Sequence, residues 1–343
     1  MKLIEIDGSQ FEGGGQILRT ATSLSAITGI PCRIFNIRKK RKKPGLMWQH
    51  LLAIESLAKL CNGKVEGLKL GSEEIKFFPG KIQSKDLTIE IKTAGSITLI
   101  LQALLPVSFF AEKPVNFHFK GGATDTFFSP TIDYLRYVFS KILEKMGLFF
   151  EIKILKRGFF PEGGAEVKVK VFPGKPKSIT LLKKGSLKRV LIISGATENL
   201  KERKVAERQI SGAKSVLKKF KLPLEEKIEY YSSTLSTGSQ INVIAEYEKT
   251  VLGSDNLGKI GKSAEKVGKE AAENLLKEEI SGGVLDKYMA DQILPYLALS
   301  DSKSEVLVSE ITLHAKTNMW VISKFLKGFF KIQNKKIIWY PLS

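Results

Sequence analysis

The segment GGGQILRTATSLSAITG (13–29) begins with three glycines and continues with apolar residues at helical spacing. One face of the segment is apolar at every turn: Ile17, Leu18, Ala21, Leu24 and Ile27. This period predicts an amphipathic helix. Strands are expected on both sides of it, at 2–7 and at 31–38, where β-favouring residues dominate. The chain therefore begins as strand, glycine turn, helix and strand, which is the start of an α+β unit.

The same kinds of element then recur along the first half of the chain. Further helices are expected where apolar residues return at helical spacing, at 47–63, 96–111 and 129–147. Further strands are expected near 66–69, 73–79, 87–92, 115–122, 148–156 and 165–174. The pattern returns after roughly 80–90 residues, which predicts a repeated unit made of a small sheet with two helices on one face.

The stretch 185–280 interrupts this pattern. It contains two highly charged helical segments, 201–222 and 261–280, around expected strands at 227–231 and 240–248. We interpret it as a smaller α+β domain inserted into a larger one.

After Gly282 and Gly283 the first pattern resumes. The expected elements are a helix at 284–300, a strand at 305–311, a helix at 316–326 and a strand at 336–342. The predicted fold class is therefore α+β, with three repeats of a two-helix, four-stranded unit and an insert that splits the last repeat. The predicted domains are a large one, 1–184 with 281–343, and an inserted one, 185–280.

The chain is strongly basic, with 55 Lys and Arg against 35 Asp and Glu and a formal net charge of +20. A positive field of this size favours polyanionic partners such as nucleic acid. A lysine-rich surface adapted to high temperature has a similar composition. Charge alone therefore leaves both interpretations open.

Composition and local sequence also indicate the cellular compartment of the protein. The longest apolar run, 96–111, is shorter than the roughly 20 residues that a membrane span needs. The first residues, MKLIEIDGSQ, lack the features of a signal peptide. Two cysteines are too few for a disulfide framework, and three histidines make a protein-bound zinc site improbable. We expect a cytoplasmic protein without membrane contact.

The turn FEGGGQ (11–16) is the first candidate site. Glycines allow close approach of the backbone to a ligand, and the N–H groups of a helix start can receive phosphate. Glu12 beside the turn is a candidate metal ligand. A tight turn with a solvated glutamate is the equal alternative.

The segment RKKRKKPGLMWQH (38–50) begins with six consecutive Lys and Arg residues. Arg38 and Arg41 offer forked donors for a terminal phosphate. Trp48 and Gln49 add stacking and amide hydrogen bonds. Taken alone, the segment is equally consistent with a solvated basic loop.

Four residues of the last repeat also carry potential chemistry. Tyr288, Asp291 and Gln292 lie within one helical turn and are expected to face one cleft. His314 is expected between a strand and a helix, where functional residues of α/β units collect. It is either a structural side chain or a nucleophile that attacks an α-phosphate. His118 is expected to be structural, and His50 is expected either to be structural or to support the site residues from behind.

Several segments together closely resemble the RNA 3′-terminal phosphate cyclase family. They occur in order over almost the whole chain: EGGGQILRTATSLSAITG, RKKRKKPGLMWQH, TAGSITLILQALLP, GGATDTFFSP, RGFFPEGG and YMADQILPYLALS. The resemblance implies repeats like the C-terminal domain of translation initiation factor three, with a smaller inserted domain. It also implies ATP-dependent conversion of an RNA 3′-phosphate to a 2′,3′-cyclic phosphate, through a histidine-bound AMP and an RNA-3′-pp-5′-A intermediate.

The resemblance assigns roles residue by residue. HAKTN (314–318) matches the family's His-x-x-Thr-Asn segment, which implies that His314 is the nucleophile. Glu12 resembles the carboxylate that helps to hold Mg²⁺ or Mn²⁺. Three residues resemble the groups that bind the RNA phosphate: Arg38, Arg41 and Gln49. Six resemble nucleotide-binding residues: Arg19, Gln102, Pro130, Tyr288, Asp291 and Gln292.

Two alternatives remain. One is a non-catalytic, RNA-binding relative that acts in ribosome biogenesis, which lacks the active-site histidine. The other is an enolpyruvyl transferase, which shares a similar repeat architecture and does not require the His-x-x-Thr-Asn segment. The expected partners are RNA 3′-phosphate ends and ATP, and the oligomeric state stays open, a homodimer included.

Overall fold

A computed structural model describes residues 3–218 and 224–342 of the chain. The first strand, β1 (Ile4–Asp7), leads through the glycine turn into α1 (Gly15–Thr28). The helix starts two residues later than predicted because Gly13 has a φ of 60° and Gly14 is the extended N-cap. It ends at Gly29, whose φ of 70° lies in the left-handed region. Glycine adopts this conformation at little cost in free energy.

Three four-stranded sheets share one topology, in which the strand order is first, second, fourth, third. The first sheet contains β1, β2 (Cys32–Phe35), β4 (Ile75–Phe78) and β3 (Lys64–Glu66). The second contains β5 (Leu87–Ser96), β6 (Val115–Ala123), β8 (Glu166–Phe172) and β7 (Phe149–Lys156). The third contains β9 (Thr180–Leu181), β14 (Ser304–Leu307), β16 (Lys336–Pro341) and β15 (Gly328–Gln333).

In each of the three sheets the first pair of strands is parallel and the other pairs are antiparallel. The α+β class is thus confirmed, and the shared topology of the three sheets is compatible with a repeated unit. The likeness of that unit to the C-terminal domain of translation initiation factor three stays a prediction.

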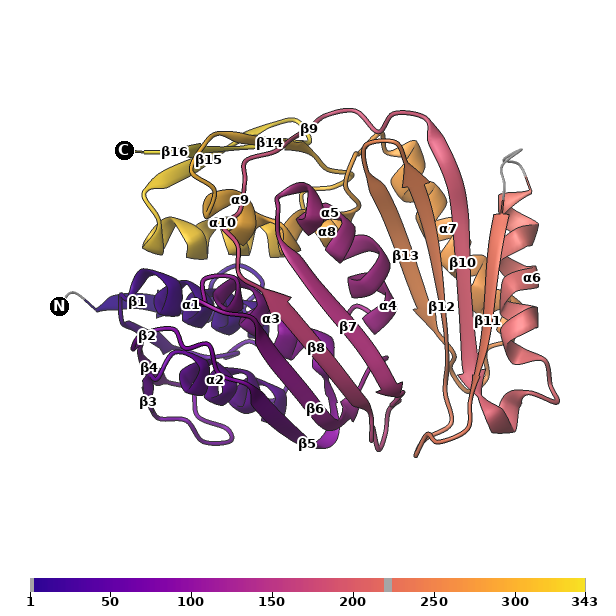
Figure 1. The fold of residues 1–343 in the computed structure, drawn as a ribbon, viewed down its shortest axis with the longest axis horizontal. Helices are drawn as coiled ribbons and strands as arrows, with labels where there is room; N and C mark the ends of the chain where they lie inside the picture. The colour runs from indigo at the N-terminus through magenta and orange to yellow at the C-terminus, as the bar shows by residue number, and fades with distance from the viewer. Residues whose placement is uncertain (1–2, 219–223, 343) are drawn as a thin grey trace.

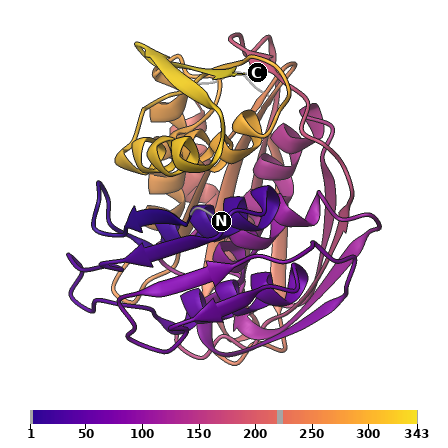
Figure 2. The same ribbon diagram turned by 90° about the vertical axis from the view of Figure 1, so that its left-hand side faces the viewer.

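The helices of the three units meet between the sheets (Figures 1 and 2). Helix α1 contacts helices from all three units: α2 (Trp48–Leu60), α3 (Ile97–Ser108) and α10 (Leu313–Phe325). Along β5 and β8 buried and exposed residues alternate, so one face of the second sheet covers the helices and the other faces solvent. This arrangement brings the starts of α1 and α10 together.

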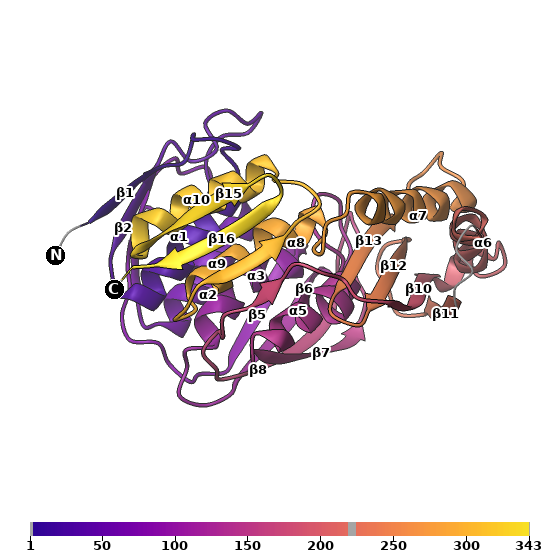
Figure 3. The ribbon, with the colours of Figure 1, turned by 90° about the horizontal axis from the view of Figure 1, so that it is seen from above.

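The region after β9 forms a fourth sheet with its own hydrophobic cluster, at one end of the molecule (Figures 1 and 3). Its elements are β10 (Leu187–Thr197), α6 (Val205–Leu217), β11 (Leu224–Tyr231), β12 (Ser239–Tyr247), β13 (Val251–Leu257) and α7 (Ala264–Ile280). Strands β10 and β13 were not predicted. Part of the predicted helix 201–222 lies outside the described residues. The domain boundaries at 184/185 and 280/281 stay a prediction.

Several predicted elements differ from the structure. The helix expected over 284–300 is broken into α8 (Lys287–Gln292) and α9 (Leu294–Ala298), because Pro295 lacks an N–H and starts a new helix. The helix expected over 129–147 contains a π-helical stretch, Leu135–Phe139, between α4 (Ile132–Tyr134) and α5 (Ser140–Lys145). Strand β15 was also missed.

The expected position of His314 between a strand and a helix is wrong. Helix α10 starts at Leu313, three residues earlier than predicted, so His314 lies in its first turn. The reason is Thr312, whose hydroxyl caps the helix by accepting a hydrogen bond from the Ala315 N–H at 3.1 Å.

Within the described part of the chain, no helix combines the length and the apolar character that a bilayer crossing requires.

Candidate active site

The glycine turn, the basic loop and the start of α10 line one cavity of about 710 Å³. Six predicted site residues, far apart in the sequence, line this cavity: Glu12, Arg19, Arg38, Arg41, Gln49 and His314. We call it the main cavity. The sequence motifs thus converge on one place in the fold.

The glycines of the turn make room for side chains. A Cβ on Gly14 would lie 2.1 Å from Glu12 Oε2, and a Cβ on Gly15 would lie 2.3 Å from His50 Nε2. The N-terminus of α1 has no side-chain cap, and Gly14, Gly15 and Gln16 line the cavity. The positive end of the helix dipole therefore lies at the cavity, where it favours an anion.

Glu12 has two oxygens in different surroundings. Oε1 forms an ion pair with Arg41, while Oε2 is buried and has no hydrogen-bond partner in the described chain. No group of three or more His, Cys, Asp or Glu side chains able to hold a metal occurs among the described residues. Mg²⁺ commonly uses one or two protein carboxylates together with substrate phosphates and water. The free oxygen of Glu12 fits that mode of binding.

Arg19 is a cation without a hydrogen-bond or ion-pair partner in the described part of the chain. Its guanidinium makes neither a hydrogen bond nor an ion pair that involves the described residues, although it lies at the cavity wall. Burial lowers the pKa of Arg19 to about 10, partly offset by the charge of Asp291. Because the group stays charged near neutrality, it is suited to bind an anion such as a triphosphate.

His314 projects from the first turn of α10, and its side chain is 51% exposed. Its Nδ1 lies 2.7 Å from Oε1 of Gln16 and 3.9 Å from Oε2 of Glu12. Burial and the positive charges of Arg19 and Arg41 lower the pKa of His314. The imidazole is therefore neutral at neutral pH, which a nucleophilic nitrogen requires.

The two partner residues in the HAKTN segment tie α10 to its neighbours. Thr317 Oγ1 accepts a hydrogen bond from the Glu12 N–H at 3.4 Å. Asn318 accepts one from the Thr20 hydroxyl at 2.7 Å and donates one to the Asp291 carbonyl at 2.8 Å. These contacts fix the position of His314 relative to the glycine turn and to α8.

His50 lines the cavity as well, where the sequence predicted either a structural or a supporting role for it. Its Nδ1 accepts a hydrogen bond from the Met47 N–H at 3.1 Å, so the ring proton is on Nε2, near Gly15. Burial, helped by Arg19 and Arg38, lowers the pKa of His50 to about 3. It is therefore a neutral donor at the cavity. No local signal marked it, because its closeness to Gly15 is a tertiary contact.

A second, small cavity of about 30 Å³ lies behind Arg19 and collects three more predicted residues: Gln102, Asp291 and Gln292. Gln102 Nε2 donates to Gln292 Oε1 at 3.0 Å, which links α3 to α8. Burial raises the pKa of Asp291 to about 7, against the opposing charge of Arg19.

Pro130 and Tyr288 are not among the residues that line either cavity. The carbonyl of Pro130 accepts a hydrogen bond from the Thr98 hydroxyl at 2.8 Å, and Tyr288 is 45% exposed. The expectation that Tyr288 faces the same cleft as its helix neighbours stays a prediction.

Arg38 is partly used within its own loop. Its Nη1 donates to the carbonyls of Lys43 and Gly45, at 2.7 and 2.9 Å. Exposed aromatic side chains stand at the same cavity: Trp48, Phe128 and Phe160. Cationic and aromatic groups together are the usual surface for single-stranded nucleic acid.

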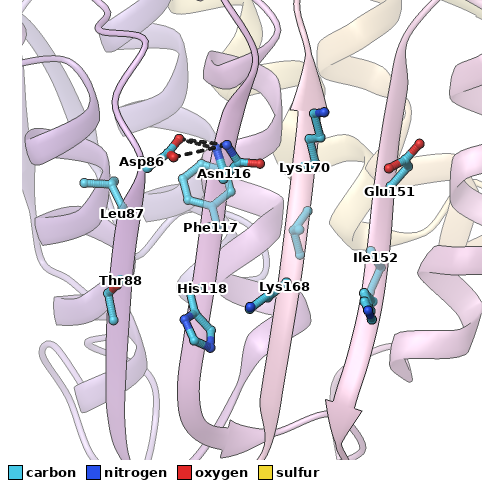
Figure 4. A pocket seen from close by; sticks show the side chains of 12 residues that line it. Asp86, Leu87, Thr88, Asn116, Phe117, His118, Glu151, Ile152, Lys168 and Lys170 are labelled. Atoms are coloured by element: carbon cyan, nitrogen blue, oxygen red, sulfur yellow. Dashed lines mark hydrogen bonds between the residues drawn. The ribbon is translucent and has the colours of Figure 1, made fainter.

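A separate hollow of about 620 Å³ lies on the outer face of the second sheet (Figure 4). Three lysines and two acidic residues are among the residues that line it, and Asp86 accepts hydrogen bonds from Asn116. His118 lies on this face, with Nε2 at 2.8 Å from Glu166 Oε1. This cross-strand pair supports the structural role expected for His118 and places it outside the main cavity.

Comparison with known proteins gives one consistent result. The model of the RNA 3′-terminal phosphate cyclase family matches residues 10–332. The RNA 3′-terminal phosphate cyclase of Pyrococcus abyssi (strain GE5 / Orsay) is 47% identical over 334 residues, which cover 97% of this chain and 96% of that protein. The protein of the same name from Pyrococcus furiosus is 48% identical over 332 residues, covering 96% and 95%. The one from Methanopyrus kandleri is 42% identical over 343 residues, covering 98% and 97%.

Proposed function

The chain belongs to the RNA 3′-terminal phosphate cyclase family, and we propose that it converts an RNA 3′-phosphate to a 2′,3′-cyclic phosphate with consumption of ATP. The observation that carries this proposal is the meeting of three groups in one cavity: His314, Arg19 and the oxygen of Glu12 that has no hydrogen-bond partner among the described residues. A nucleophile, a triphosphate-binding cation and a metal-binding oxygen are the parts that nucleotidyl transfer needs.

In the first proposed step, the lone pair of His314 Nε2 forms a bond to the α-phosphorus of ATP. The bond from that phosphorus to the bridging oxygen breaks, and pyrophosphate leaves with the electron pair. Arg19 and the N-terminus of α1 lie where they can hold the triphosphate. Magnesium or manganese, held by Glu12 Oε2, supplies charge neutralisation when it is bound.

In the second step, an oxygen of the RNA 3′-phosphate attacks the adenylate phosphorus, and the electron pair of the N–P bond returns to His314 Nε2. The neighbouring 2′-hydroxyl then attacks the RNA phosphorus, loses its proton and displaces AMP. Arg38, Arg41 and Gln49 are suited to hold the RNA phosphate, with His50 as a neutral donor beside them.

The nucleotide itself has further proposed contacts. Gln102, Asp291 and Gln292 line the small cavity together with Arg19, which supports a role for them on the nucleoside side of the triphosphate. Pro130 and Tyr288 line neither cavity. We propose that they contact the adenine at the edge of the site.

The test is to incubate the protein with α-labelled ATP and Mg²⁺ and to look for acid-labile, base-stable label on the protein. His314→Ala should take no label, whereas His118→Gln, a change on the outer face of the second sheet, should label as the wild type does. Failure of the wild type to take label, or equal labelling of His314→Ala, rejects the proposal. RNA binding without any labelling would support the non-catalytic, RNA-binding alternative.

A further inference from the structure

The side chain of Gln16 lies between His314 and Asp291, which come from two different helices. Its Oε1 is 2.7 Å from His314 Nδ1, and its Nε2 is 2.8 Å from Asp291 Oδ2. Gln16 is only 5% exposed and lies in the first turn of α1.

Chemistry decides which way round the amide of Gln16 points. Asp291 Oδ2 is a hydrogen-bond acceptor in the carboxylate, and also in the acid when the proton is on Oδ1. An amide turned the other way would place Oε1 against Oδ2, acceptor against acceptor, inside a buried site. Asp291 therefore selects the orientation in which the NH₂ group faces it and Oε1 faces His314.

The orientation of the amide in turn decides the tautomer of His314. Oε1 can only accept, so Nδ1 must carry the ring proton and donate it. The other nitrogen, Nε2, then keeps its lone pair and is not used by the described residues. The partner of one ring nitrogen commonly sets the state of the other in this way.

We infer that Gln16 is a positioning residue that holds His314 in its Nδ1–H tautomer, with Asp291 fixing the direction of the Gln16 amide. The catalytic consequence rests on the proposed function, because only an attack through Nε2 needs that lone pair. The hydrogen-bond relay itself is independent of it. Since Nδ1–H keeps its acceptor throughout, no proton has to leave the ring when the N–P bond forms or breaks.

The relay can be tested by NMR on protein labelled with ¹⁵N in its histidine rings. With three histidines in the chain, the ring signals are assignable from His314→Ala and His118→Gln. The wild type should show the Nδ1–H pattern for His314. Gln16→Met keeps the length of the side chain but removes the acceptor, so His314 should shift toward the Nε2–H form that free histidine prefers.

A double variant provides the matched rescue. Asp291→Asn alone allows either amide orientation and should mix the tautomers. When Asp291→Asn is combined with Gln16→Glu, the new amide at position 291 donates to one oxygen of the new carboxylate, and the other oxygen accepts from His314 Nδ1. Labelling with AMP should fall by roughly 10- to 100-fold in Gln16→Met and recover in the double variant relative to Asp291→Asn.

Two results overturn the inference: an Nε2–H pattern in the wild type, or a His314 tautomer that does not change in Gln16→Met. A purely structural role for Gln16 would lower stability without changing the tautomer, so a thermal melt accompanies each spectrum. If the tautomer responds as expected but the wild type never takes label, the proposed function fails while the positioning of His314 by Gln16 stands.

Discussion

Arg41 holds one carboxylate oxygen of Glu12 in an ion pair, and the other oxygen of the same side chain is buried without a partner in the described chain. The basic loop therefore reaches across to the glycine turn and fixes the direction of the carboxylate. Arg41 also donates to the Glu12 carbonyl at 3.1 Å. This geometry joins the group proposed for the RNA phosphate directly to the group proposed for the metal.

Glu12→Gln should raise the Mg²⁺ concentration that half-saturates AMP labelling by about 10-fold or more, because a neutral amide is a weaker ligand for a hard cation. The measurement is the initial labelling rate at a series of Mg²⁺ concentrations. Glu5→Gln is the control, since Glu5 pairs with Arg33 away from the cavity. An unchanged Mg²⁺ requirement in Glu12→Gln contradicts the metal role.

The pH dependence of labelling should reflect the lowered pKa of His314. Attack needs the neutral ring, and the neutral form is fully populated above the pKa. The labelling rate should therefore fall on acidification with its midpoint below about pH 6.5, the pKa of a free histidine. Initial rates at saturating ATP and Mg²⁺ check this. A rate already halved at or above about pH 6.5 would show that the surrounding positive charges do not act on His314.

Gly15→Ala should damage the site while leaving the fold intact. The added Cβ would meet His50 Nε2 at 2.3 Å and displace the ring, whereas alanine in place of glycine favours a helix. We expect cyclisation of 3′-phosphate RNA to slow by roughly 10- to 100-fold with an unchanged or higher melting temperature.

Gly29→Ala, at the other end of the same helix, is the matched control for that prediction. No described atom lies within 4 Å of its added Cβ, but its φ of 70° costs an alanine about 1 kcal/mol. It should lower the melting temperature and keep the activity. Equal activity in the two variants would contradict a role for His50 in the reaction.

Arg157 joins the second unit to the inserted region and predicts a stability effect. Its side chain is 3% exposed and binds Asp125 Oδ2 at 3.0 Å and Asp133 Oδ2 at 2.5 Å. It also lies 5.0 Å from the centre of the Tyr231 ring, and Gln240 of β12 donates to the same Asp133 oxygen. Removing the cation leaves Asp125 buried without its counter-charge and leaves Asp133 with the more exposed Arg136 alone.

Arg157→Met should therefore lower the free energy of unfolding by about 3–5 kcal/mol, as is usual when one partner of a buried ion pair is lost. Urea denaturation followed by circular dichroism measures this change. Arg136→Met is the control, since Arg136 binds Asp133 as well but is 31% exposed, so its loss should cost at most about 1 kcal/mol. If both variants lose the same free energy of unfolding, the burial of Arg157 does not add to its contribution to stability.

Local patterns were enough to predict much of the fold. The helix over 13–29, the strand at 115–122 and the repeat itself follow from the spacing of apolar residues and from glycine turns, which are properties of neighbouring residues. The errors also have local causes. Pro295 broke a predicted helix, and the hydroxyl of Thr312 started α10 earlier than the apolar pattern indicated.

The sequence by itself determined which chemical groups the site could use: the carboxylate of Glu12, the arginines of the basic loop and the histidine of HAKTN. Only the tertiary structure decided how they are used. Gln16 and His314 are 298 positions apart, and Gln102 and Gln292 are 190 apart. A local pattern carries no information on such pairs, because their contact depends on how three sheets and their helices pack. That packing buries Gln16, and it leaves one oxygen of Glu12 without a hydrogen-bond partner among the described residues.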